Sequence, residues 1–209
     1  MKITFHGGAR EVTGANYLFE AERAKILIDC GLFQGNKEFD DLNFKPFAYA
    51  PEEIDALFVT HAHVDHVGRI PKLVRDGFHG RIFSTAATRD LARLLLEDTM
   101  RLEQRENREL FNEEDLDRAS ELWEVLPYYE EVNIKGISVT LYNAGHILGS
   151  SFIVCRAEGR RIWFTGDLGN IPSVLVPPPD VAQDVDYLII ESAYGNRAHE
   201  SAGDRLLQL

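Results

Sequence analysis

Short apolar runs recur along the chain, each rich in β-branched or aromatic residues and bounded by glycine or polar residues. Runs of this kind are typical of β-strands, in which alternate side chains point to opposite faces of a sheet. They gather towards the two ends of the chain and leave a gap in the middle. We predict strands at residues 3–5, 16–19, 25–28, 57–60, 81–84, 137–141, 151–155, 161–165 and 186–190.

The gap in the middle has the spacing of helices instead of strands. A first helix is predicted around leucines that recur at roughly helical intervals among Arg and Glu residues: Leu91, Leu94, Leu95 and Leu102. Asn112 is placed to cap a second helix, and the acidic residues 113–115 suit the positive end of its dipole. Pro127 marks the end of this second helix, and its apolar positions are Leu116, Ala119, Trp123 and Leu126.

Proline defines two further segments. A short helix is predicted to begin at Pro71 and reach Gly77, and residues 176–179, with three consecutive prolines, are predicted to form a stiff loop. Strands at both ends with helices between them indicate an α/β (α+β) chain, in which a sheet-on-sheet core is covered by helices. A length of 209 residues suits one domain.

The composition is that of a folded globular protein, with 44% hydrophobic and 27% charged residues. No apolar run approaches the roughly 20 residues of a membrane span, and the chain starts in a strand without a secretory signal. Cys30 and Cys155 are too few for a disulfide framework, so we expect reduced thiols in a cytoplasmic protein. The net charge of −12 counts against a nucleic-acid partner, although it does not set the field inside one cleft.

Residues 61–66, His-Ala-His-Val-Asp-His, place four potential metal ligands directly after an apolar strand. Imidazole and carboxylate groups are ligands that proteins offer to zinc. In an extended segment His61, His63 and Asp65 would share one face, whereas His66 would break the period. The alternative is a solvated turn, which would require three of the seven histidines to gather around one aspartate by chance.

Five predicted strands each end in a polar residue suited to a metal site, and strands of one sheet share a rim where such side chains can meet. Taken alone, His146 and Asp167 could be structural turn residues. Asp29 alone could cap a turn, and Glu191 alone could be the first exposed residue after a strand. Together with the histidine cluster, these positions predict one metal site that draws on Asp29, His61, His146, Asp167 and Glu191.

The motifs around these residues also resemble a known family. The metallo-β-lactamase superfamily has a motif similar to the one found here: His61-x-His63-x-Asp65-His66, then Gly68, and later His146 and Asp167. Its β-CASP branch of RNA-processing nucleases, which includes RNase J and the endonuclease subunit of the pre-mRNA 3′-end cleavage machinery, is similar at residues 8–14, 29–35, 144–150 and 191–197. The resemblance covers residues 1 to about 200, and Ala193 stands where the family usually has threonine.

The resemblance implies an αββα sandwich whose metallo-β-lactamase-like catalytic core, residues 1–200, is incomplete in this chain. In the family a β-CASP domain is inserted after the region of Tyr194 and Gly195. The chain then returns with a last metal-binding histidine and a histidine thought to act as general acid. Residues 201–209 would begin the helix leading into that insert, so the C-terminal part of the fold would be missing, and His199 matches neither histidine.

The resemblance also assigns roles to the predicted site. Two zinc ions would be held, and a hydroxide shared between them would attack the phosphorus of an RNA phosphodiester. Asp65 would in addition orient that hydroxide. The ligands of the first zinc would be His61, His63 and His146; those of the second would be Asp65 and His66; and Asp167 would bridge both.

Asp29 and Glu191 would support the ligands by fixing imidazole tautomers through the ring nitrogen far from the metal. Without the last histidine, we expect this chain to retain the first zinc better than the second and to cleave RNA poorly or not at all. Two other hypotheses stay open: a hydrolase of thioesters or lactams on the same scaffold, and a non-catalytic metal-binding module. Residues 11–14 and 194–197 favour the nuclease, with RNA as partner, no membrane, and a homodimer left open.

Overall fold

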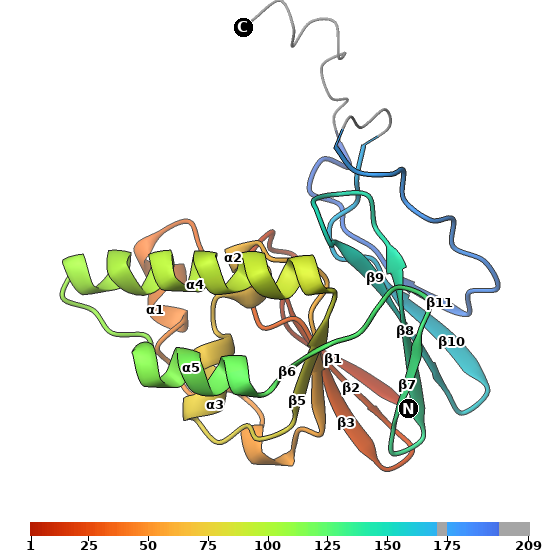
Figure 1. The fold of residues 1–209 in the computed structure, drawn as a ribbon, viewed down its shortest axis with the longest axis horizontal. Helices are drawn as coiled ribbons and strands as arrows, with labels where there is room; N and C mark the ends of the chain where they lie inside the picture. The colour runs from red at the N-terminus through yellow and green to blue at the C-terminus, as the bar shows by residue number, and fades with distance from the viewer. Residues whose placement is uncertain (171–174, 197–209) are drawn as a thin grey trace, which may run out of the picture.

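Two β-sheets pack face to face, and helices cover the outer face of one of them (Figure 1). The computed structural model describes residues 1–170 and 175–196. The mixed α/β fold with a sheet-on-sheet core is therefore as predicted. The predicted start of a helix at residues 201–209 lies outside the described residues, as does His199.

The first sheet combines an antiparallel part with a parallel part. Strands β1 to β3 are joined antiparallel, and β3 to β6 are parallel to one another. In spatial order the sheet contains β1 (Lys2–Gly7), β2 (Asn16–Ala21), β3 (Ala24–Ile28), β4 (Ala56–Phe58), β5 (Arg81–Ser84) and β6 (Trp123–Val125). The three residues of β4 are buried on both faces, as expected of a central parallel strand.

The second sheet is antiparallel except at one edge, where β10 and β11 are parallel. Its order in space is β11 (Tyr187–Ile189), β10 (Arg160–Phe164), β9 (Ser151–Ala157), β8 (Ile137–Asn143) and β7 (Glu131–Ile134). Residues 175–186, which lead into β11, contain neither helix nor strand, which confirms the predicted loop around the prolines.

The helices lie together on the outer face of the first sheet (Figure 1). They are α1 (Lys37–Leu42), α2 (Val64–Val67), α3 (Ile70–Arg75), α4 (Ala86–Arg105) and α5 (Glu113–Glu121), with a 3-10 turn at Pro51–Glu53. In the described part of the chain no helix covers the outer face of the second sheet, so one of the two predicted helical layers is seen. None of the described helices is long and apolar enough to cross a membrane.

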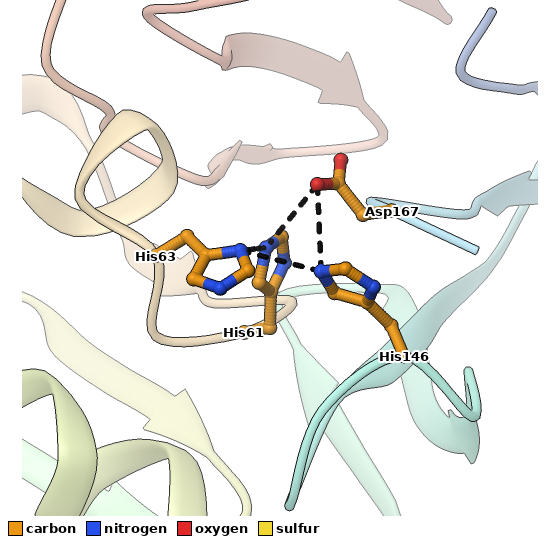
Figure 2. A group of neighbouring side chains, drawn as sticks. All are labelled: His61, His63, His146 and Asp167. Atoms are coloured by element: carbon orange, nitrogen blue, oxygen red, sulfur yellow. Dashed lines mark hydrogen bonds and ion pairs between the residues drawn. The ribbon is translucent and has the colours of Figure 1, made fainter. Parts of the chain in front are cut away.

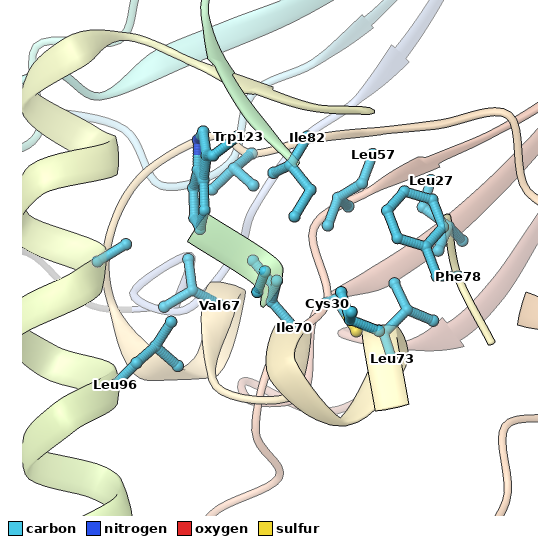
Figure 3. Packing of buried hydrophobic residues seen from close by; sticks show 14 of the residues in the cluster. Leu27, Cys30, Leu57, Val67, Ile70, Leu73, Phe78, Ile82, Leu96 and Trp123 are labelled. Atoms are coloured by element: carbon cyan, nitrogen blue, oxygen red, sulfur yellow. The ribbon is translucent and has the colours of Figure 1, made fainter. Parts of the chain in front are cut away.

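Alternation along the strands of the first sheet builds two hydrophobic cores. Leu27 packs towards the helices, whereas its neighbours Ile26 and Ile28 pack towards the second sheet. Leu57 and Phe58 divide in the same way. Figure 3 shows the core between sheet and helices, with Val67, Ile70, Leu73, Leu96 and Trp123 around Leu27, Cys30, Leu57, Phe78 and Ile82. Because the first sheet is buried on both faces, the ends of its strands, which the site residues follow, are held in place.

The predicted end of the second helix, at Pro127, is wrong. Asn112 caps it as predicted, but α5 stops at Glu121, and Trp123–Val125 form β6 beside β5. The Trp123 indole Nε1 donates a hydrogen bond to Ser84 Oγ at 2.8 Å, so tertiary packing decides this segment. Two of the predicted apolar positions in the first helix, Leu94 and Leu102, are exposed.

Candidate metal centre

The predicted ligands meet at one end of the sandwich, where segments from both sheets come together. Asp29 and His61 follow β3 and β4 of the first sheet. His146 lies in the loop between β8 and β9, and Asp167 follows β10 of the second sheet. The prediction that the strands of one sheet share this rim is therefore wrong in one respect, because the site lies between the ends of two sheets.

The histidine cluster folds differently from the extended segment that was predicted. His63 is the N-cap of α2, so Asp65 and His66 lie on a short helix. Three backbone hydrogen bonds hold this turn against neighbouring loops, from Ala15 N to Asp65 O (2.9 Å), from Cys30 N to His66 O (2.8 Å) and from Leu32 N to Val64 O (2.8 Å). As a result Asp65 faces His66 and does not share a face with His61 and His63.

Three imidazoles and one carboxylate form a compact group (Figure 2). His63 Nδ1 lies 3.0 Å from His61 Nε2 and 3.2 Å from His146 Nε2. Asp167 Oδ2 lies 3.6 Å from both His61 Nε2 and His146 Nε2. One ligand atom from each residue is within 4.8 Å of all the others, which is the arrangement that could hold a metal ion.

The second carboxylate oxygen of Asp167 faces another group. Asp167 Oδ1 lies 3.3 Å from His66 Nε2, and Asp65 Oδ2 lies 3.7 Å from the same nitrogen. Asp167 therefore presents one oxygen to the three-histidine group and the other to the pair of Asp65 and His66. That Asp167 bridges two metal ions stays a prediction.

Asp29 and Glu191, the two predicted supporting residues, behave differently. Asp29 is fully buried, and its Oδ2 accepts a hydrogen bond from His66 Nδ1 at 2.7 Å, while its role in fixing the tautomer of a metal ligand stays a prediction. Glu191 Oε1 instead accepts from the backbone N–H of Leu168 at 2.7 Å. Among the contacts of the described residues, Glu191 supports the loop that carries Asp167 rather than an imidazole.

The pKa values of His66 and His61 are shifted in opposite directions. Burial would lower the pKa of His66, but the charge of Asp29 and hydrogen bonds to Asp167 and Asp29 raise it to about 10. Burial and the neighbouring imidazoles lower the pKa of His61 well below its usual value. Burial raises the pKa of Asp65, whereas the hydrogen bond and charge of His66 outweigh burial at Asp167 and lower its pKa.

Two residues without a predicted role also shape the site. Thr60 is buried between Asp29, His61 and His66, and its hydroxyl lies within hydrogen-bond distance of all three. Ser150 Oγ accepts from the backbone N–H of His146 at 3.0 Å and so closes its loop. The signal in the sequence was a hydroxyl residue directly before His61 and another at the end of the glycine-bounded turn around His146.

Comparison with known proteins identifies the family. Residues 18–168 match the family model described as the metallo-β-lactamase superfamily domain. The chain belongs to this superfamily. A solved structure of a B3 metallo-β-lactamase with an active-site glutamic acid aligns with a TM-score of 0.51 and 20% identity, over 81% of this chain and 62% of that chain. This likeness supports the fold alone.

Curated relatives agree with the predicted RNA-processing branch. A ribonuclease of Thermus thermophilus is 40% identical over 199 residues, which make up 95% of this chain and 45% of that protein. The cleavage and polyadenylation specificity factor 73 of Drosophila melanogaster is 34% identical over 208 residues, or 95% of this chain and 29% of that protein. The chain thus spans less than half the length of these curated relatives.

Proposed function

We propose that this chain supplies the metal-binding catalytic part of a β-CASP-type nuclease that hydrolyses phosphodiester bonds of RNA with the help of zinc. The observation that carries the proposal is the meeting of His61, His63, His146 and Asp167 within 4.8 Å, from separate segments of a metallo-β-lactamase fold. The names of the relatives, a ribonuclease and a cleavage factor, support RNA as the substrate.

The donor set fits zinc. Three imidazole nitrogens and a carboxylate oxygen are the donors that zinc favours over the oxygen-only sets of calcium or magnesium. The lowered pKa values of His61 and His146 keep these rings neutral, as metal ligands must be. We propose the first zinc at His61, His63 and His146, the second at Asp65 and His66, and Asp167 between them.

A bound zinc pair would supply Lewis-acid chemistry, by lowering the pKa of water and by offsetting the charge on a phosphoryl oxygen. The protein residues have separate tasks. Asp29 Oδ2 holds the proton on His66 Nδ1. Nε2, which faces Asp65 and Asp167, is then the nitrogen that would give up its proton to a metal. The half-buried Asp65 carboxylate, with its raised pKa, is placed to accept a proton from the attacking water.

Two other functions have the same metal geometry: hydrolysis of thioesters or lactams, and metal binding without catalysis. One fold hosts many reactions, so only the substrate distinguishes them. RNA is favoured because both reported relatives with more than 30% identity have names that refer to RNA processing. A cytoplasmic location, a homodimer and the absence of a membrane partner stay predictions.

The test is cleavage of end-labelled RNA by zinc-loaded chain in excess over substrate, with and without a chelator, beside a thioester assay. We expect slow cleavage that the chelator and Asp167→Asn abolish. Asp117→Asn, which changes an exposed carboxylate on α5, is the matched control and should cleave as the wild type does. Thioester hydrolysis without RNA cleavage would support the second function. Zinc binding without either reaction would support the third.

A further inference from the structure

Thr60 contacts several of the segments that form the candidate metal centre. It is 1% exposed and precedes His61 directly. Its backbone oxygen accepts from Ser151 N at 2.7 Å, which ties the end of the first sheet to the start of β9 in the second. A side chain on Gly166 would come within 2.7 Å of Thr60 Oγ1, so the loop that carries Asp167 packs against this hydroxyl.

The hydrogen bonds around Thr60 can be ordered from donor to acceptor. A carboxylate only accepts, so Thr60 N–H donates to Asp29 Oδ1 at 2.7 Å and Thr60 Oγ1–H donates to Asp29 Oδ2 at 2.7 Å. With its single proton used, Oγ1 can only accept. His61 Nδ1, at 3.1 Å, must then be the protonated nitrogen. The network therefore leaves His61 Nε2 with its lone pair facing His63 and His146.

The position of the proton on His66 follows from the same hydrogen bonds, but here the ring bonds Asp29 directly. His66 Nδ1 lies 2.7 Å from Asp29 Oδ2 but 3.3 Å from Thr60 Oγ1, so its proton goes to the carboxylate. The buried carboxylate of Asp29 thus fixes which ring nitrogen is protonated in His66 directly, and in His61 through the hydroxyl of Thr60. The two ligand groups are connected by this single relay.

We propose that Thr60 is a positioning residue that fixes the Nδ1–H tautomer of His61 and links the two halves of the metal centre to Asp29. The inference rests on the proposed metal centre. Partners that orient a ligand imidazole commonly change metal affinity by about 10- to 100-fold when they are removed. We expect a loss of that size at the three-histidine group when the hydroxyl is removed.

Two substitutions separate the hydroxyl from the shape of the side chain. Thr60→Val keeps the branched shape in a fully packed position but cannot donate or accept, whereas Thr60→Ser keeps the hydroxyl and loses a methyl group. Ser84→Ala is the matched control, because it removes a buried hydroxyl whose hydrogen bonds go to Thr85 O and Trp123 Nε1 instead of an imidazole. Circular dichroism and thermal unfolding check that each variant is folded.

The experiment has two readouts besides activity. Long-range 15N–1H spectra of the metal-free chain show which nitrogen of His61 carries the proton, and competition with a chelating dye gives the affinity for zinc. We expect Nδ1–H in the wild type and in Thr60→Ser. Thr60→Val should lose this preference and bind zinc about 10-fold or more weakly, while Thr60→Ser and Ser84→Ala bind within about threefold of the wild type.

The outcomes distinguish this inference from the function it rests on. A wild-type chain whose His61 carries its proton on Nε2 overturns the role of Thr60, even if Thr60→Val does not fold. Unchanged zinc affinity in a folded Thr60→Val also overturns it. A wild-type chain that binds no zinc at the three histidines instead removes the proposed metal centre itself, whatever the tautomer of His61.

Discussion

His66 lies among three carboxylates, and its charge state follows from them. Asp29 contacts its Nδ1 at 2.7 Å, while Asp167 and Asp65 lie 3.3 Å and 3.7 Å from its Nε2. Its pKa of about 10 means that the ring is cationic at neutral pH before a metal enters. A metal bound at Nε2 must displace one proton, so affinity at this group should rise with pH.

The raised pKa of His66 also predicts how stability of the metal-free chain depends on pH. A group whose folded pKa of about 10 exceeds its ordinary value of 6.5 stabilises the fold fully below 6.5, and this contribution is lost as pH rises towards 10. From pH 6.5 to 9.5, in chelator, wild type should lose on the order of 3 kcal/mol more stability than His66→Gln. Urea unfolding measures this, and equal slopes of stability against pH would contradict it.

Asp167 is the residue whose loss should affect both ligand groups. Asp167→Asn keeps the shape but removes the charge that faces His61 and His146 on one side and His66 on the other. We expect zinc affinity to fall by about 100-fold in both binding steps, whereas His66→Gln should weaken mainly the second. Calorimetric titration separates the steps, and a variant of Asp167 that binds two zincs as the wild type does would refute the bridging position.

At the level of elements, local sequence patterns predicted the strands well. Each of the nine predicted runs overlaps a strand, because each run is bounded by turns and needs only its own alternation to be recognised. The edge strand β7 and the helix α1 were not predicted. β7 has only four residues and buries none of them fully, and α1 also buries none, so both have a weak apolar signal.

Local sequence patterns also predicted part of the site. The candidate ligands were visible because they lie in loops after strands or in the cluster at residues 61–66, but their meeting between two sheets depends on tertiary packing. The apolar spacing from Leu116 to Leu126 fits a helix, yet pairing with β5 turns Trp123–Val125 into a strand. The turn of α2 likewise depends on backbone hydrogen bonds to distant loops, such as Ala15 N to Asp65 O. Thr60 was recognisable only as a hydroxyl residue directly before His61.

The capping box at the start of α5 should stabilise this helix. Asn112 Oδ1 accepts from Asp115 N and Asp115 Oδ2 accepts from Asn112 N, both at 3.1 Å. Asn112→Ala should lower stability by about 1 kcal/mol, which is roughly 2–4 °C in Tm for a chain of this size. Glu114→Ala, an exposed change in the same helix, is the control. Unchanged thermal unfolding of Asn112→Ala would argue against the cap.

The whole molecule carries a net charge of −12, which opposes a polyanionic substrate at long range. The proposed zinc ions would offset this locally, because bound cations are often the largest charges in a site. RNA binding by the metal-loaded chain should therefore depend on the site more than on the surface. We expect the chelator to weaken RNA retention in filter binding, and binding that is equal with and without chelator would contradict this.

Zinc content tests how the two ligand groups differ within this chain. Among the described residues, the three-histidine group offers three imidazoles and Asp167, whereas the other group offers Asp65, His66 and the shared carboxylate. We expect one zinc per chain to survive dialysis and a second to be lost. Elemental analysis measures this ratio, and two retained zincs would show that the second group is complete.

The central claim is that separate segments of both sheets assemble one metal centre. Anomalous diffraction at the zinc edge, from crystals grown with zinc, locates the ion directly. We predict a strong peak bounded by His61 Nε2, His63 Nδ1, His146 Nε2 and Asp167. Zinc-loaded crystals without a peak among these four residues, or with their side chains turned apart, would contradict it.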